Sequence, residues 1–137
     1  MTQEERNLLC IDLSGRLRYG VMLRVYGQDG PKLYDFNEEL YSLFIDGDTF
    51  SINDRGTGDN EGVCEIRPYL RPMGHMSTKE KDILHSLMVK RDDQFYYSYY
   101  LSLEAIDWLN EHHFDYRNLI DKGLALVAPD GMYEEIR

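Results

Sequence analysis

The residues best suited to bind a ligand lie in the short segment Ile66–Pro72, where two arginines flank a tyrosine. Alternate side chains of an extended chain point to the same face, so Arg67, Tyr69 and Arg71 share one side of a strand. A guanidinium group presents a planar fork of donors to a carboxylate or phosphate, which makes this trio a candidate anion clamp. The alternative is that the arginines pair with acidic side chains of the same chain.

Two adjacent histidines precede an aspartate near the C-terminus, and histidine is the usual acid–base residue and metal ligand in proteins. His112, His113 and Asp115 are therefore the acid–base candidates of a small-ligand site. The competing interpretation is structural, with His113 closing the apolar face of a helix and His112 capping its final carbonyl groups. Adjacent helical side chains point about 100° apart, and neither an HExxH spacing nor a CxxC pair occurs, so no metal site is expected.

No sequence signature of enzymatic catalysis is present. The chain lacks the GxSxG nucleophile motif, the GxxxxGK[ST] phosphate loop and a complete GxGxxG fingerprint. Neither Cys10 nor Cys64 has the spacing of a redox pair or an adjacent histidine, and both are expected to be reduced core residues. The sequence therefore favours a protein without enzymatic activity and without a cofactor.

Charge is distributed unevenly along the chain. The net charge is −10, and residues 28–65 carry ten acidic and two basic side chains, which leaves only −2 for the remainder. Binding to duplex DNA, RNA or anionic membranes depends on neutralising phosphates, so this balance argues against general nucleic-acid or membrane binding. The acidic segment is either a solvated face or a docking face for a basic protein partner. Its interface candidates are Asp46, Asp48, Asp54 and Asp59.

Tyrosine is enriched, with 11 residues in the chain, and four of them cluster within five positions. Tyr96, Tyr97, Tyr99 and Tyr100 belong to a segment predicted to be a short strand or an extended linker. Tyrosine combines a large contact area with a polar tip, so an exposed cluster is a candidate interface. The alternative is a sheet strand whose tyrosines are half-buried.

The elements that must position these residues follow from the hydrophobic period and the turn residues. A helical period predicts helices, branched and aromatic runs predict strands, and glycine, proline and Asp-Gly pairs mark the turns. Residues 53–62 contain no apolar side chain and are expected to form an exposed loop. The expected helices are 2–17, 77–91, which opens with a capping box, 102–113 and a short one over 115–123, and the expected strands are 21–26, 32–36, 40–45, 49–52 and 63–70.

This order of elements predicts a single α+β domain over residues 1–137. We expect an N-terminal helix, a curled antiparallel sheet of about four or five strands, and C-terminal helices packed on one face. Residues 1–72 hold the helix and the sheet, and residues 73–137 are mainly helical.

Two segments, IRPYLRPMGHMS at Ile66–Ser77 and DWLNEHHFDYRNLIDKGLALVAPDGMY at Asp107–Tyr133, resemble a family of short uncharacterised proteins from prophages and mobile elements of gut bacteria. Together they span 39 of the 137 residues, and the HHFDYR-x-LI-x-KGLA run is the most specific part of the match. The resemblance supplies no activity, cofactor or ligand. It implies an intracellular accessory protein of a mobile element.

The sequence thus predicts a non-enzymatic, cytoplasmic accessory protein that contacts an unidentified, basic protein partner through its acidic face. A homo-oligomer is compatible with the same surfaces. The alternative is a small pocket at Arg67, Tyr69 and Arg71 that binds or hydrolyses an anionic metabolite or nucleotide. Neither an apolar stretch as long as a membrane span nor a secretory signal is seen.

Overall fold

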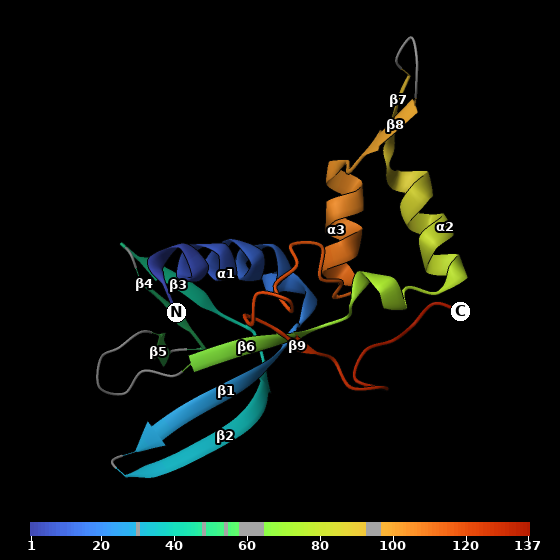
Figure 1. The fold of residues 1–137 in the computed structure, drawn as a ribbon. Helices are drawn as coiled ribbons and strands as arrows, with labels where there is room; N and C mark the ends of the chain where they lie inside the picture. Colours follow the sequence, from blue (N-terminus) through green and yellow to red (C-terminus); the bar gives the residue numbers. More distant parts are fainter. Residues whose placement is uncertain (30, 48, 54, 58–64, 93–96) are drawn as a thin grey trace.

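The computed structural model describes residues 1–29, 31–47, 49–53, 55–57, 65–92 and 97–137. Helices and strands are both present, which confirms the α+β class. The helices are α1 (Gln3–Arg16), α2 (Thr78–Leu87) and α3 (Leu103–Glu111). In Figure 1, α1 lies over the largest sheet, whereas α2 and α3 stand side by side beyond the end of that sheet.

Helix α1 begins at a reciprocal capping box. The Thr2 hydroxyl accepts from the Glu5 amide at 3.1 Å, and the Glu5 carboxylate accepts from the Thr2 amide at 3.4 Å. Leu9 and Leu13, one helical turn apart, are fully buried in the first hydrophobic core. A 3-10 turn, η1 (Leu17–Tyr19), then ends the helix and leads into the first strand.

The largest sheet has four strands in the order β2-β1-β6-β9. β1 (Met22–Asp29) pairs antiparallel with β2 (Lys32–Glu39) and with β6 (Glu65–Leu70). The short β9 (Leu126–Val127) runs parallel to β6. The sheet is therefore mixed, and not wholly antiparallel as the sequence suggests, because an apolar segment from far along the chain joins its edge.

A second sheet contains β3 (Leu43–Asp46), β4 (Thr49–Ile52) and β5 (Arg55–Thr57) in that order. The hairpin predicted at the Asp-Gly pair between β3 and β4 is confirmed, with Gly47 at a positive φ of 58°. β5 lies within the segment predicted to be an exposed loop. Pairing with β4 explains this difference, since a strand needs no apolar residue of its own when it extends an existing sheet edge.

Asn53 is buried at the end of β4, although the sequence predicts an exposed loop that begins at this residue. Its Oδ1 accepts from the Tyr41 and Ser42 amides at 2.9 and 3.1 Å, and its Nδ2 donates to the Glu39 carbonyl at 2.8 Å. Asn53 also has a positive φ of 47°, a conformation that asparagine adopts more readily than most residues. This side chain therefore holds the turn that leads into β3.

Helix α2 starts at its predicted capping box but ends at Leu87, about one turn before the predicted end at Arg91. The chain instead forms β7 (Val89–Asp92), which pairs antiparallel with β8 (Tyr97–Tyr100) in a two-stranded sheet. β8 is the tyrosine-rich strand, and pairing with such a strand overrides the helical period of the preceding residues.

Two clusters of buried apolar side chains stabilise the fold. The first lies between α1 and the two larger sheets and includes residues 119, 124 and 125, whereas the second joins α2, α3 and Phe114. Within the described part of the chain, α1 covers the main sheet, and the C-terminal helices build a core of their own rather than covering one sheet face. Gly15 permits α1 to approach α3, because a Cβ there would lie 2.8 Å from the Asn110 side chain.

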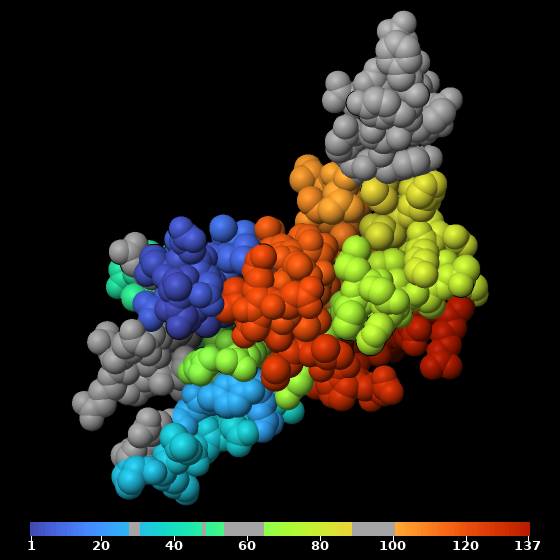
Figure 2. Space-filling view, in the orientation of Figure 1, coloured from blue at the N-terminus to red at the C-terminus, as the bar shows by residue number. Residues whose placement is uncertain are grey.

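The segment that follows α3 joins these two parts of the molecule. In Figure 2 its orange-red atoms lie between helix α1, in blue, and the yellow-green residues that precede and begin α2. Several of the predicted ligand-site residues belong to this segment or to the end of β6, so they lie close to this junction.

Candidate functional site

The candidate site centres on Arg71, where the chain leaves β6 and meets the segment after α3. The Arg71 amide donates to the His113 carbonyl at 2.7 Å, and the Asp115 amide donates to the Arg71 carbonyl at 2.9 Å. Residues 71 and 114 thereby form a parallel bridge just beyond β6. The backbone thus brings together four of the predicted ligand-site residues, namely Arg71, His112, His113 and Asp115.

Glu80 of α2 holds the Arg71 side chain. Arg71 Nη2 lies 2.7 Å from Glu80 Oε1 and Nη1 lies 2.8 Å from Oε2, and Glu80 is fully buried. Glu80 Oε1 also accepts from the Ser77 amide at 3.0 Å, so one carboxylate both caps α2 and neutralises the arginine. Burial raises the pKa of Glu80, but the hydrogen bonds and the charge of Arg71 outweigh it and hold the pKa below 4.5.

Phe114 connects the two cores at this site. The Arg71 guanidinium lies over its ring, with 4.1 Å between Cζ and the ring centroid, and the ring stacks on Trp108 at 5.8 Å. The Phe114 carbonyl accepts from buried Arg16 at 2.7 Å, and Arg16 Nε pairs with Asp12 at 2.7 Å. The sequence does not predict this role, because a single phenylalanine outside a periodic segment carries no signal of burial.

His113 and Tyr133 form a stacked pair with ring centroids 3.8 Å apart. Tyr133 Oη donates to the Tyr69 carbonyl at 2.8 Å and accepts from the Met22 amide at 2.9 Å, so it bonds two strands of the main sheet. Burial raises the pKa of Tyr133 to about 12. Burial, together with nearby positive charges, lowers the pKa of His113 to about 4, so both rings are uncharged at neutral pH.

Asp115 and His112 serve the backbone. Asp115 Oδ1 accepts from the Leu119 amide at 2.8 Å and Oδ2 from the Ile120 amide at 2.9 Å. The prediction of a short helix that begins at Asp115 is wrong, because this segment consists of turns in which Asn118 has a positive φ of 62°. His112 is the C-cap residue of α3.

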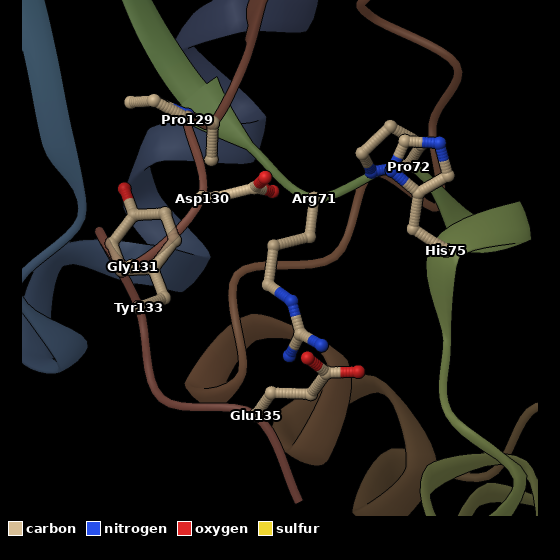
Figure 3. Close-up of a pocket in the computed structure, with 9 residues that line it drawn as sticks. Arg71, Pro72, His75, Pro129, Asp130, Gly131, Tyr133 and Glu135 are labelled. Atoms are coloured by element: carbon tan, nitrogen blue, oxygen red, sulfur yellow. The ribbon is translucent and has the colours of Figure 1, made fainter.

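A cavity of about 380 Å³ opens beside Arg71. Its wall combines the end of β6 and the 3-10 turn η2 (Met73–His75) with the segment that follows β9. Figure 3 shows the Glu135 carboxylate pointing toward the Arg71 guanidinium, with Asp130 on another part of the wall. The ionisable side chains of the lining belong to Arg71, His75, Asp130, Tyr133 and Glu135.

The charge of this lining argues against an anionic metabolite or nucleotide. Glu80 neutralises Arg71, whereas Asp130 and Glu135 are two carboxylates of the same wall. An anion entering the cavity would meet more negative than positive charge. The alternative function expected from the arginines of the sequence is therefore disfavoured at this cavity.

Arg67 and Tyr69 are half-buried on β6, where side chains of other residues contact them. Arg67 Nη2 pairs with Glu65 at 2.9 Å, and its Cζ lies 5.7 Å from the Tyr26 ring centroid. Tyr69 Oη donates to Asn37 Oδ1 at 3.0 Å. The internal pairing expected as the alternative for Arg67 is thus present. Arg71, the third residue of the trio, pairs with Glu80 of α2.

Among the predicted interface residues, Asp46 has a described side chain, which is exposed at the end of β3. Asp48, Asp54, Asp59 and Tyr96 lie outside the described residues. Tyr97, Tyr99 and Tyr100 lie on β8, and their side chains also fall outside the described part of the structure.

Beside Asp46 the structure exposes three large apolar side chains. Tyr41, Phe44 and Ile45 are 65%, 67% and 57% exposed, and β3 is an edge strand of the second sheet. We name the surface formed by Tyr41, Phe44, Ile45 and Asp46 the β3 edge. The sequence does not predict this exposed surface, because an apolar run in a predicted strand normally indicates burial.

Among the residues that the structure describes, no three His, Cys, Asp or Glu side chains are grouped to hold a metal ion. No described helix combines the length and apolar composition that crossing a membrane requires. Comparison with protein-family models, curated proteins and solved structures found no match.

Proposed function

We propose that this protein is a non-enzymatic binding module that docks a basic segment of a protein partner along the β3 edge. The observation that carries the proposal is the exposure of neighbouring Phe44 and Ile45 on a strand paired on one side within the described sheet. Proteins usually protect such edges, because an open apolar strand readily pairs with another one. The proposal includes the cytoplasmic, mobile-element setting that the resemblance implies.

The geometry of β3 suits an extended occupant. Adjacent residues of a strand point to opposite faces, so Phe44 and Ile45 offer an incoming strand apolar contact on both faces. The outer main-chain groups of an edge strand supply hydrogen bonds, and the side-chain contacts supply selectivity. An occupant with alternating side chains fits this arrangement.

Charge supports a basic occupant. Asp46 is exposed at the end of β3, and residues 28–65 contain ten acidic and two basic side chains. Such a surface attracts lysine and arginine and repels acidic segments, and the attraction weakens as salt screens it. We therefore expect the partner segment to alternate apolar and basic residues.

Two short synthetic peptides test the proposal, one alternating Lys and Val and the other alternating Glu and Val. Fluorescence anisotropy should show binding of the Lys-Val peptide alone, with affinity falling about tenfold or more on going from low to high salt. Ile45→Lys should abolish this binding. Leu33→Lys is the matched control, because Leu33 is 77% exposed on β2, an edge strand of the four-stranded sheet. This variant should retain peptide binding.

Equal binding of both peptides, or equal loss in both variants, would contradict the proposal. Sedimentation at increasing protein concentration tests a second copy of the chain as the occupant. If the protein forms a dimer that Ile45→Lys dissociates, and the Lys-Val peptide does not bind, then the occupant of the β3 edge is a second copy of the chain and not a basic partner.

A further inference from the structure

We infer that the cavity beside Arg71 binds an organic cation, a guanidinium or primary ammonium group, through Asp130 and Glu135. The site is separate from the β3 edge, because its wall belongs to the end of β6, η2 and the C-terminal segment. Its volume of about 380 Å³ lies within the range of small-ligand sites. The chemical class of the ligand follows from the donors and acceptors of the wall.

Part of the backbone of this wall has no free donor to offer a ligand. Three of its amides donate to backbone carbonyl groups at 2.7, 3.0 and 2.8 Å, and two further residues of the wall are prolines, which have no N–H. At these five positions an anion therefore finds no free main-chain donor. The five residues concerned are Arg71, His75, Ala128, Pro72 and Pro129.

Two side-chain donors of the wall are engaged as well. The Arg71 guanidinium holds both carboxylate oxygens of Glu80 and lies 3.4 Å from the His112 carbonyl oxygen. The Tyr133 hydroxyl donates to the Tyr69 carbonyl. An anionic ligand would have to break these buried hydrogen bonds to gain its own, which costs free energy.

The acceptors, in contrast, are accessible. Asp130 and Glu135 are exposed residues that line the cavity. Glu135 has a long ion pair with Arg137, whose Nε lies 3.7 Å from Oε2 and whose side chain is 87% exposed. Such an exposed pair is weak, so it can exchange for an external cation. It also shows that a guanidinium reaches this carboxylate.

Tyr133 adds an aromatic surface to the two carboxylates. Its ring is held by the stack on His113 and by two hydrogen bonds of its hydroxyl. Aromatic faces attract cations, and a ring already fixed in place loses little conformational entropy when a ligand binds. Carboxylates, an aromatic ring and proline rings together favour a cation with an apolar stem.

Two probes distinguish the possible sources of the cation. N-acetyl-arginine amide carries the guanidinium of a protein side chain on an uncharged backbone, whereas putrescine is a free diamine. Titration at neutral pH, followed by NMR shifts of the backbone amides of residues 128–135, should show cation binding, and inorganic phosphate should produce no saturable shift. Tighter binding of the capped arginine assigns the site to a basic side chain of a partner, and tighter binding of putrescine assigns it to a free amine.

Matched variants test the carboxylates. Asp130→Asn and Glu135→Gln should each weaken cation binding about tenfold. Glu134→Gln removes the same charge from an exposed residue outside the cavity wall and should leave binding unchanged. Arg137→Gln removes the competing guanidinium and should tighten binding about twofold. Absence of binding by both cations, preferential binding of phosphate, or an equal loss in Glu134→Gln would overturn the inference.

Discussion

Arg16 Nη2 donates a 2.7 Å hydrogen bond to the Phe114 carbonyl across 98 positions of sequence, and both residues are fully buried. The bond connects helix α1, which belongs to the first core, to a residue of the second core. Asp12, also fully buried, accepts from Arg16 Nε, and Arg117 Nε lies 3.4 Å from its other carboxylate oxygen. A buried ionic cluster therefore joins the two cores.

Arg16→Met should lower the free energy of unfolding by about 3–5 kcal/mol, because it leaves the buried Asp12 carboxylate with only the longer Arg117 contact. Urea unfolding followed by circular dichroism measures the change. Adding Asp12→Leu should restore much of the loss, since two apolar side chains replace the pair. Arg67→Met is the control on an exposed pair and should cost less than about 1 kcal/mol. A double variant no more stable than Arg16→Met would contradict the prediction.

Glu80→Gln should also destabilise the protein by about 3–5 kcal/mol, because Arg71 then remains buried without its counter-charge. The folded-state pKa of Glu80 lies below 4.5, so its stabilising contribution is complete above pH 4.5 and is lost as the pH falls through the folded-state value. The difference between wild type and Glu80→Gln should therefore shrink on acidification. Unfolding measured at a series of pH values checks this, and a difference that stays constant would disagree with it.

His113 predicts a second pH dependence, in a higher range. Its pKa is about 4 in the folded protein against 6.5 ordinarily, so the unfolded chain binds a proton that the folded chain excludes. Its stabilising contribution is complete above pH 6.5 and is lost as the pH falls toward 4. His113→Asn does not titrate, and asparagine tolerates the positive φ of 64°. The free energy of unfolding should therefore depend less steeply on pH in this variant, and an unchanged slope would refute the prediction.

Asn53→Ala should lower the free energy of unfolding by about 2–4 kcal/mol, since it removes three hydrogen bonds and places alanine at a positive φ. Asn53→Gly removes the same hydrogen bonds but adopts the positive φ without strain, so it should cost less. Thermal unfolding compares the two variants. The alanine variant should also bind the Lys-Val peptide more weakly, because Asn53 holds the turn before β3. Equal losses of stability in both variants would argue against a contribution from the positive φ.

Local patterns of the sequence predicted where several elements begin and turn. Ser77 caps α2, Ser102 caps α3 by accepting from the Ala105 amide at 3.0 Å, and Gly47 occupies the β3–β4 hairpin. Each of these features depends on residues within a few positions of one another, which is the range that capping and turn rules describe. The α+β class could therefore be predicted from the order of such elements.

The partners of the buried charges could not be predicted in this way. The sequence suggested that Arg67 and Arg71 pair with acidic side chains of the same chain, and Arg67 does so with Glu65. Arg71 instead pairs with Glu80, because the capping box of α2 holds that carboxylate where the chain leaves β6. The parallel strand β9 and the hydrogen bonds of Tyr133 likewise join residues far apart in sequence, where local periodicity carries no information.

The hydrogen bonds of Tyr133 to Met22 and Tyr69 have a consequence for the order in which the molecule is assembled. During synthesis on a ribosome, α1 and the β1–β2 hairpin emerge long before the segment that completes their core. The apolar side of that hairpin stays in contact with water or a chaperone until residues 119–133 have been synthesised. Nascent chains stalled before this point should be readily cleaved by proteases. Chains that include residues 119–133 should resist cleavage, because this segment completes the first core.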